Sequence, residues 1–370
     1  MRVVTAEQRR KGGSQMNTRR VQDFVVKGKE IFVGLEDSKK TWKLAVHSER
    51  MLIHRALMEA EYQVLSRYLK NNFPECIIHL IYEAGFKGFT LHDQLAGDGV
   101  DCLVIPPHMV TEPKVNRVKT DKRDANRLAV ILENHDFKDV CHVPDKERRE
   151  DRQISRTLIG IQKDIVRTRN RIHKLLDFHG IHVSSSRWGR ADFRALATLT
   201  LPESLRISLD VLLDELTHLW TYRTTLRAAL RRLCQKERYH KAWEIARSVP
   251  GIGWFTAIRL VLELGEDLTH FTSGKKIASF VGLACSEYSS GETQWKGRIT
   301  GMGSGFIRMT LIESSWVAIR KDPVLLAKFS RVWHSSGSKK KAIVGVARML
   351  IVRLRACMVL GCPYRIGVVQ

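Results

Sequence analysis

The sequence predicts a mixed α/β domain at the amino terminus, then a long helical region and a mainly helical carboxyl-terminal domain. Three observations support this fold class. First, residues 31–105 contain several short apolar runs of the kind that form strands. Second, leucine and isoleucine then recur at near-heptad spacing. Third, turns that contain glycine separate the later apolar helical stretches. A length of 370 residues suits two or three domains. The expected division is a basic extension at 1–30, the α/β domain at 31–144, a helical coiled-coil region at 145–240 and the carboxyl-terminal domain at 241–370.

The α/β domain opens with three short apolar runs whose connections leave room only for tight turns, so they should form an antiparallel meander. Two further apolar runs alternate with helical spacing, and the second stops at Pro106-Pro107. This β-β-β-α-β-α-β order, followed by a helix, predicts a ribonuclease-H-like mixed sheet whose later strands are joined by right-handed crossovers. The expected elements are strands at 31–35, 42–46 and 50–54, a helix at 59–70, a strand at 76–82, a helix at 89–96, a strand at 100–105 and a helix at 122–133.

The two regions that follow are predicted to be helical. Their heptad-like apolar spacing favours long helices that pair as an antiparallel hairpin or mediate oligomerisation. The turn Ser248-Val-Pro-Gly-Ile-Gly253 then resembles the turn of a helix-hairpin-helix unit. The expected elements are helices at 145–179 and 204–238 separated by a break at 184–188, a helix at 254–264, an apolar segment at 277–283, a Gly/Ser-rich stretch at 286–305 and helices at 306–320 and 339–360.

The charge balance points to a polyanionic partner. Lysine and arginine number 62 against 39 acidic residues, which leaves a net charge of +23 and a pI of about 10.0. Phosphate backbones, which release counterions when basic groups bind them, are the partner that such an excess favours. With 44% apolar and 27% charged residues, the composition argues against a mostly disordered, fibrous or membrane-spanning protein.

Cysteine usage and the amino terminus indicate the cellular compartment. Seven scattered cysteines without a C-x-x-C pair predict reduced thiols, and neither disulfides nor a zinc site. Residues 1–30 lack the apolar core of a secretory signal, and no window approaches eighteen uninterrupted apolar residues. We therefore expect a cytoplasmic protein without a membrane partner.

Acidic residues stand at the predicted ends of two strands and at the start of a helix. Glu36, with Asp37 beside it, ends the first strand, and Glu83 directly follows the fourth. Asp121 and Asp124 are three residues apart and share one face of a helical turn. In the predicted topology these positions converge at one edge of the sheet, where Mg²⁺ would neutralise the clustered carboxylates. Taken singly, Asp121 could instead be a helix cap and Glu83 a solvated loop residue.

A serine in the segment Tyr288-Ser-Ser-Gly291 is a candidate nucleophile. Gly291 lets the backbone turn sharply, so that Ser290 can present its hydroxyl from a short polar loop. Attack on a phosphodiester also needs a base or metal and cations for the developing charge. A Ser-Gly dipeptide is more often a simple turn.

Basic residues and free amides near these positions are candidate nucleic-acid-binding groups. The amides at the helix start after the 248–253 turn could cradle a phosphate, although a plain interhelical turn is the alternative. The basic residues that flank the acids could meet phosphates or only neutralise the carboxylates. The candidates are Lys119, Lys122, Arg123, Gly251, Gly253, Arg298 and Arg308.

Several motifs together resemble those of the insertion-sequence-110 transposases, the bridge-RNA-guided recombinases of bacterial mobile elements. The resemblance spans about Ile31 to Leu325. Its motifs are Val33-Gly-Leu-Glu-Asp-Ser-Lys39, Tyr82-Glu-Ala-Gly85, Lys119-Thr-Asp-Lys-Arg-Asp-Ala125, Val249-Pro-Gly-Ile-Gly253, Phe280-Val-Gly-Leu283, Ser290-Gly291 and Gly305-Phe-Ile-Arg308.

The resemblance implies a RuvC-like domain with an acidic quartet, a coiled-coil linker and a carboxyl-terminal domain with a nucleophilic serine. By position, the quartet is Glu36, Glu83, Asp121 and Asp124, which would hold Mg²⁺, and Ser290 is the serine that becomes linked to DNA. The implied partners are donor and target double-stranded DNA, a structured non-coding guide RNA and further copies of the chain, as a homodimer or homotetramer. The implied location is the bacterial nucleoid.

Two departures from the family pattern affect residue assignments. The first acidic position usually holds aspartate, so either Glu36 or Asp37 takes the role, and strand alternation lets only one of them reach the site. Ala284-Cys285 stands where the family commonly has a proline, which leaves Ser289 as a second candidate nucleophile.

Two other functions fit parts of the sequence. A RuvC-like junction endonuclease would use the acids and metal-bound water without a covalent step. A non-catalytic nucleic-acid-binding protein would use only the basic surface, and its acids would be structural.

Overall fold

The computed structural model describes residues 27–107, 121–137, 140–182, 189–290 and 293–367, and the chain forms two compact units. The first unit ends at Val143 and the second begins at Pro144. Side chains at 121–123, 190–191 and 287–296 lie outside the description, although the backbone there is described except at 291–292. Within the described part of the chain, no helix is long and apolar enough to cross a membrane.

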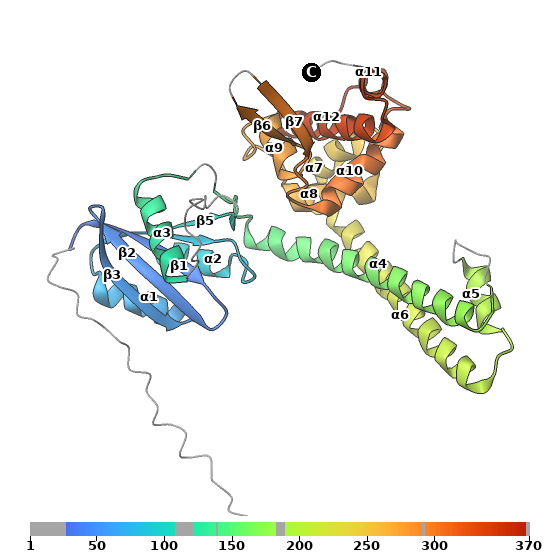
Figure 1. Ribbon diagram of the computed structural model, residues 1–370, viewed down its shortest axis with the longest axis horizontal. Coiled ribbons are helices and arrows are strands. Elements are labelled where there is room, and N and C mark those ends of the chain that lie inside the picture. The colour runs from blue at the N-terminus through green and yellow to red at the C-terminus, as the bar shows by residue number, and fades with distance from the viewer. Residues whose placement is uncertain (1–26, 108–120, 138–139, 183–188, 291–292, 368–370) are drawn as a thin grey trace, which may run out of the picture. The chain divides into compact units, whose positions relative to one another are not determined.

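The first unit is built around a five-stranded mixed sheet in the order β3-β2-β1-β4-β5 (Figure 1). The first three strands pair antiparallel, whereas β4 runs parallel to β1 and to β5. This arrangement confirms the predicted mixed α/β class and is consistent with a ribonuclease-H-like sheet. The elements are β1 (Glu30–Asp37), β2 (Thr41–Ser48), β3 (Met51–Glu59), α1 (Tyr62–Asn72), β4 (Ile77–Glu83), α2 (Thr90–Gly97), β5 (Asp101–Ile105) and α3 (Asp121–Glu133).

All three strand ends predicted in the meander were wrong, and β2 continues two residues beyond its expected end, to Ser48. β1 continues two residues beyond the expected end, so that Glu36 and Asp37 lie within the strand. β3 runs on to Glu59, which displaces the start of the first helix from the expected position to Tyr62. The turn before β3 places Glu49 and Arg50 at φ values of 51° and 63°, the left-handed geometry of tight hairpin turns.

Helices cover both faces of this sheet. Side chains of α1 and α2 pack with Val33 and Leu35 of β1 in one apolar cluster. On the other face, α3 crosses β1 at Gly34, where an added Cβ would lie only 2.0 Å from the carbonyl oxygen of Ala125. Leu128 of α3 packs there with apolar residues of β4 and β5. Gly34 therefore sets the close approach of α3, because any larger side chain would push the helix away.

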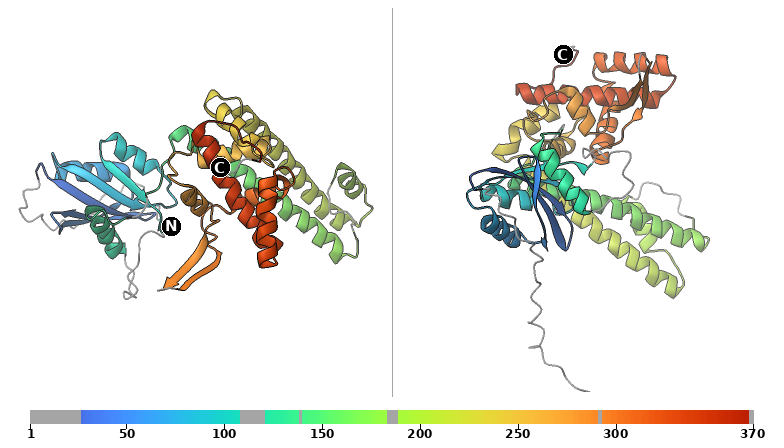
Figure 2. Two further views of the ribbon diagram at one scale, coloured as in Figure 1. Left: turned by 90° about the horizontal axis from the view of Figure 1, so that it is seen from above. Right: turned by 60° about the vertical axis from the view of Figure 1, so that its left-hand side comes forward.

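The second unit contains a long helical hairpin made of α4 (Lys146–Phe178) and α6 (Glu203–Leu233), with α5 (Arg190–Ala197) near its tip (Figures 1 and 2). The pairing is antiparallel, since Lys236, just past α6, contacts Glu147, while Thr168 donates to Glu215 at 3.1 Å. Buried leucines and isoleucines of both helices fill the seam. Of the two predicted roles of these helices, pairing as an antiparallel hairpin is therefore confirmed.

The remaining elements form a mainly helical body. They are α7 (Glu237–Ser248), α8 (Trp254–Leu264), α9 (Gly274–Phe280), β6 (Cys285–Ser290), β7 (Thr293–Ile299), α10 (Gly305–Ala318), α11 (Pro323–Ser336) and α12 (Lys339–Leu360). The single helix predicted at 204–238 was wrong, because a turn at 234–236 separates α6 from α7. The predicted Gly/Ser-rich stretch at 286–305 contains the two-stranded antiparallel hairpin β6–β7. The predicted break at 184–188 lies outside the described residues.

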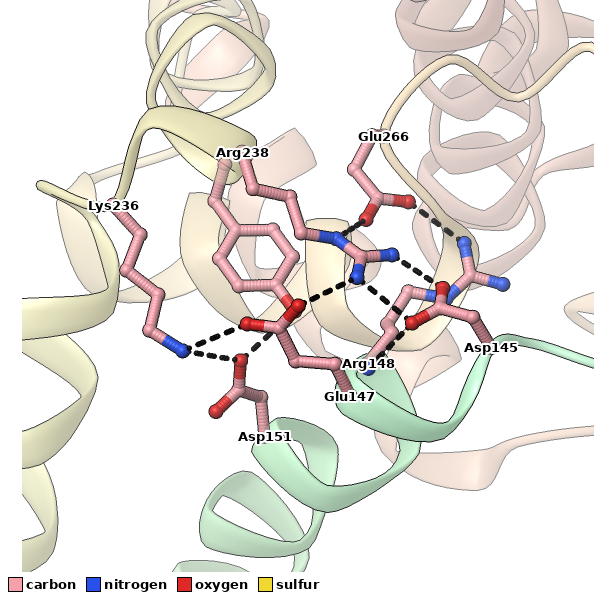
Figure 3. A network of polar contacts seen from close by, with 8 residues as sticks. Asp145, Glu147, Arg148, Asp151, Lys236, Arg238 and Glu266 are labelled. Carbon is pink, nitrogen blue, oxygen red and sulfur yellow. Dashed lines mark hydrogen bonds and ion pairs between the residues drawn. The ribbon is translucent and has the colours of Figure 1, made fainter.

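An ion-pair network fixes the base of the helical hairpin (Figure 3). Arg238 of α7 pairs with Asp145, the N-cap of α4, and donates to Glu266 at 2.6 Å. Lys236 pairs with Glu147 and with Asp151 at 3.2 and 3.0 Å. The hydrogen bond from Arg238 holds the pKa of Asp145 well below its ordinary value. The α6–α7 turn is thereby tied to the first turns of α4.

Candidate functional site

Two acidic residues lie side by side at the carboxyl ends of β1 and β4. The last recorded pair of the parallel register joins Leu35 to Tyr82, so the next step along both strands sets Glu36 beside Glu83. Glu83 is the last residue of β4 and pairs with Ile105 of β5. Neighbouring strands lie about 4.8 Å apart, and in-register residues of parallel strands share one face. The two carboxylates are therefore neighbours on the same face of the sheet.

That face is the one covered by α3. Gly34 points its open side at α3, and side chains alternate along a strand, so Glu36 points the same way. Ile81, two residues before Glu83, packs with Leu128 of α3. The strand positions alone thus direct both acids toward the layer that carries Asp121 and Asp124.

The direction of α3 brings its first turn to the same end of the sheet. Its last residue, Glu133, lies 3.2 Å from His47 Nδ1 and accepts from the backbone N–H of Arg50 at 2.5 Å. Both contacts are at the opposite end of β1, where Phe32 pairs with His47. α3 therefore runs antiparallel to β1, and Asp121 and Asp124 in its first turn lie toward the end that carries Glu36 and Glu83.

Asp124 is half-buried, whereas the side chain of Asp121 lies outside the description. Among the described side chains, no three His, Cys, Asp or Glu groups come together closely enough to hold a metal ion. The donor types nevertheless fit a hard divalent cation, since every acid at this end of the sheet offers carboxylate oxygens. Glu36 and Glu83 would hold it from the strands, and Asp121 and Asp124 from the helix.

Asp37 faces the other side of the sheet, where its contacts stabilise the fold. Its side chain is 4% exposed, accepts a hydrogen bond from Trp42 Nε1 at 2.7 Å and lies 3.2 Å from Lys87 Nζ. Lys87 also sits 4.7 Å from the centre of the Trp42 ring. Alternation along β1 directs Asp37 away from the α3 layer that Glu36 faces. Its carboxylate is already hydrogen-bonded and paired with a cation there.

A lysine that the sequence reasoning missed lies opposite Glu36. In the antiparallel register Lys43 of β2 pairs with Glu36, so both side chains are on the same face. The three basic residues predicted to flank the helical acids are Lys119, Lys122 and Arg123. Lys119 lies outside the described residues, as do the side chains of the other two.

Ser290 is the last residue of β6 and not part of a loop, as the sequence had suggested. Its partner across the hairpin is Thr293, and Ser289 pairs with Gln294. Both serines thus stand at the tip end of the β6–β7 hairpin, next to residues 291–292, which lie outside the description. Figure 2 shows the hairpin projecting from the helical body of the second unit.

The base of that hairpin is held by close backbone contacts. An added Cβ at Gly303, which has φ of 85°, would lie 1.9 Å from the carbonyl oxygen of Phe280. Arg308 of α10 donates to the carbonyl oxygens of Val281 and Met302 at 3.2 and 3.5 Å. The predicted cation Arg308 is therefore engaged in fixing these two loops. Arg298 is exposed on β7, and its carbonyl oxygen accepts from Ser286 at 3.1 Å.

The predicted phosphate cradle is a tight interhelical turn. Gly251 has φ of 84°, and an added Cβ would lie 2.2 Å from the carbonyl oxygen of Ser314 in α10. Only glycine fits, for both the left-handed backbone and the close approach. Gly253 is the N-cap of α8 and has open space around it. Packing thus accounts for Gly251, while the amides at the start of α8 remain candidates for an anion.

Comparison with known proteins identifies the family. A family model described as "Transposase", for the DEDD domain of IS110 elements, matches residues 31–181, and a second, described as "Transposase IS116/IS110/IS902 family", matches residues 244–330. A relative from Sinorhizobium fredii that carries the transposase name y4rJ is 28% identical over 88% of this chain and 90% of its own length. The transposase for insertion sequence element IS1533 of Leptospira borgpetersenii is 24% identical over 68% of this chain and 74% of its own.

The two matched regions fall on the two groups of residues described above. The first contains the strand acids and α3, and the second contains the glycine turn, the β6–β7 hairpin and Arg308. The chain is thus a member of the IS110 family of insertion-sequence transposases, whose DEDD domain implies an enzyme that cuts DNA with the help of a divalent metal.

Proposed function

We propose that the chain is a recombinase that excises and inserts its own mobile element, using Ser290 as nucleophile and a Mg²⁺ site made by Glu36, Glu83, Asp121 and Asp124. The observation that supports this most is the in-register neighbourhood of Glu36 and Glu83 on the face of the sheet covered by α3. Two carboxylates at that spacing repel one another unless a cation lies between them. The quartet matches the acidic positions of the family by order along the chain.

The proposed roles of the acids follow from their positions. Glu36 and Glu83 come from central strands, whose backbone is held on both sides by the sheet ladder, and therefore supply a rigid half of the site. Asp121 and Asp124 come from the first turn of α3, which the contact at Gly34 holds against β1. A bound Mg²⁺ would polarise a phosphodiester and neutralise charge on its oxygens. Lys43, opposite Glu36, would limit the negative charge of the site before the ion binds.

The proposed role of Ser290 is transesterification. Its Oγ would attack the phosphorus atom, form an O–P bond and lose its proton, while the O–P bond to the leaving DNA oxygen breaks and that oxygen takes up a proton. The energy of the phosphodiester is kept in the protein–DNA bond, so the reverse attack by a DNA hydroxyl rejoins strands without an external energy source. Exposed Arg298, on the strand that pairs with β6, is the proposed cation for the developing charge.

The test of this function is a trapping assay on DNA that carries the element ends. Labelled DNA is incubated with the protein and Mg²⁺, then denatured and resolved on a gel. We expect a labelled band at the mass of a protein–DNA adduct, and none when EDTA replaces Mg²⁺. Cleavage to free ends without an adduct would instead support a RuvC-like junction endonuclease. Binding without any DNA product would support a non-catalytic nucleic-acid-binding protein.

We also propose that the active assembly contains a guide RNA, double-stranded DNA and two or four copies of the chain. The net charge of +23 supports binding of two nucleic acids at once, since each carries a dense row of phosphates.

Co-purification checks the guide RNA. When the protein is expressed together with the DNA that flanks its gene, we expect one structured RNA from that flank to be enriched at least about tenfold over total RNA. Sequencing of the bound RNA provides the measurement, and the same protein expressed without the flank is the control. A bound pool that mirrors total cellular RNA would contradict this part of the proposal.

A further inference from the structure

The last turns of α6 carry an unbalanced stripe of positive charge. Between Leu216 and Lys236 there is no acidic residue, while Arg223, Arg227 and Arg231 recur at every fourth position. At 1.5 Å per residue they stand about 6 Å apart along one face of the helix. Like charges at this spacing destabilise a helix, so the stripe acts against folding and needs another explanation.

A hollow lies beside this stripe at the seam of α4 and α6. It has a volume of about 360 Å³ and is lined by Gln162 of α4 and by Arg223, Thr224 and Arg227 of α6. Every lining residue offers a hydrogen-bond donor. A hollow lined by donors and mostly polar surface suits an anion better than an apolar ligand.

Aromatic rings of α8 hold the guanidinium groups of the stripe in place. The Arg227 guanidinium lies 4.4 Å from the centre of the Phe255 ring, and that of Arg231 lies 5.2 Å from the centre of the Trp254 ring. Such stacking fixes the plane of a guanidinium while leaving its edge donors available. The stripe is therefore partly preorganised for a ligand.

A buried arginine behind the same ring has an unused donor. Arg259 is 5% exposed and lies between Phe306 and Phe255, at 3.7 and 4.8 Å from their ring centres. Its Nε donates to Ser155 at 3.1 Å, but its Nη2 has no hydrogen-bond partner within the described part of the chain. Burial lowers its pKa to about 10, so it stays charged at neutral pH. An unpaired buried donor is unfavourable in the folded chain.

The nearest acids are occupied by other cations. Glu263 of α8 is bound by both the Nε and Nη2 of Arg156, each at 3.0 Å. The acids at the base of the hairpin are paired with Lys236, Arg238 and Arg148, as Figure 3 shows. None of these carboxylates is left to balance the stripe, whose positive potential is therefore available to a ligand.

We propose that this basic face, formed by Gln162, Arg223, Arg227 and Arg231 with the buried charge of Arg259 behind it, binds the phosphodiester backbone of a nucleic acid. Planar guanidinium groups spaced along a helix suit successive phosphates, to which each can donate two hydrogen bonds. Arg227 and Arg231 contact the Phe255 and Trp254 rings, and charged donors of this kind recognise phosphates and not the base sequence. The face belongs to the second unit and uses none of the residues of the β6–β7 hairpin, so the proposal stands whether or not Ser290 is the nucleophile.

The test compares two double variants of the full chain. Arg223→Gln/Arg227→Gln removes two charges from the basic face. The matched control, Arg167→Gln/Arg171→Gln, removes two charges from the same helical hairpin, where the guanidiniums are paired with Asp164 and Glu215. Affinity for a 20-base-pair DNA duplex and for an RNA hairpin, both of arbitrary sequence, is measured by fluorescence anisotropy between 50 and 200 mM NaCl.

The readout is the slope of log affinity against log salt concentration. Each lost phosphate contact on duplex DNA reduces the slope by about 0.9, so the test variant should lose about 1.8 on the nucleic acid that uses the face, and the control should keep the wild-type slope. The probe that responds tells DNA from RNA. Equal slopes for test and control on both probes would overturn the proposal. If the test variant is less stable than the wild type, the variant Arg223→Lys/Arg227→Lys is measured in its place. It keeps both positive charges, so the proposal requires that its salt slope equal that of the wild type.

Discussion

Replacing Ser290 with alanine is expected to abolish the protein–DNA adduct and to reduce recombination at least about 10³-fold. The reason is that alanine has no oxygen to form the bond to phosphorus. Ser290 ends β6, opposite Thr293, so the change affects one hydroxyl at the tip end of the hairpin. The adduct assay on element-end DNA measures the first effect, and a plasmid excision assay measures the second.

Ser289→Ala is the matched control for this prediction. Ser289 is the preceding residue on the same strand and pairs with Gln294, and successive residues of a strand belong to opposite faces. The control should form the adduct within about threefold of the wild type. Loss of the adduct in Ser289→Ala with its retention in Ser290→Ala would transfer the nucleophile to Ser289. Cleavage that survives in both variants would exclude either serine as the nucleophile and favour hydrolysis of the DNA at the acidic site.

The sheet was predictable because its strands carry strong local signals. Ile31 to Leu35 form an apolar run, and Ile77 to Tyr82 form another that only His79 interrupts, as expected for strands covered on both faces. The predicted topology places β1 and β4 side by side, and this placement makes Glu36 and Glu83 neighbours. The separation of Glu36 from Asp37 also follows from alternation along a strand. The ion pair between Asp37 and Lys87 could not be predicted, because Lys87 lies on a loop beyond β4.

The second unit was less predictable where local signals are weak. Cys234 to Lys236 contain neither glycine nor proline, yet they end α6, since the ion pairs of Lys236 and Arg238 fix the turn against α4. The β6–β7 hairpin is rich in polar and small residues, which resemble a loop in sequence. Likewise the arginine stripe is visible as a pattern, but Phe255, which stacks on Arg227, belongs to a helix that only the fold brings near.

The variants Glu83→Gln and Asp37→Asn each remove one strand carboxylate, and we expect the first to reduce catalysis and the second to reduce stability. Glu83→Gln keeps the size of the side chain and removes a charged ligand from the proposed metal site. We expect cleavage to fall at least about 10²-fold and the Mg²⁺ concentration for half-maximal cleavage to rise, because a neutral amide oxygen binds a hard cation more weakly. The thermal midpoint should fall by less than in Asp37→Asn, since the change also removes the repulsion between two neighbouring carboxylates.

Asp37→Asn should give the opposite pattern. It retains an acceptor for Trp42 but leaves Lys87 without its carboxylate on the buried side of the sheet, at a cost of about 2 kcal/mol. For a unit of this size the thermal midpoint should fall by about 4–8 °C, while the Mg²⁺ dependence of cleavage stays that of the wild type. Titration of cleavage against Mg²⁺, with calorimetry of the same samples, measures both effects. If Asp37→Asn shifted the Mg²⁺ midpoint and Glu83→Gln did not, the metal site would lie on the other face of the sheet.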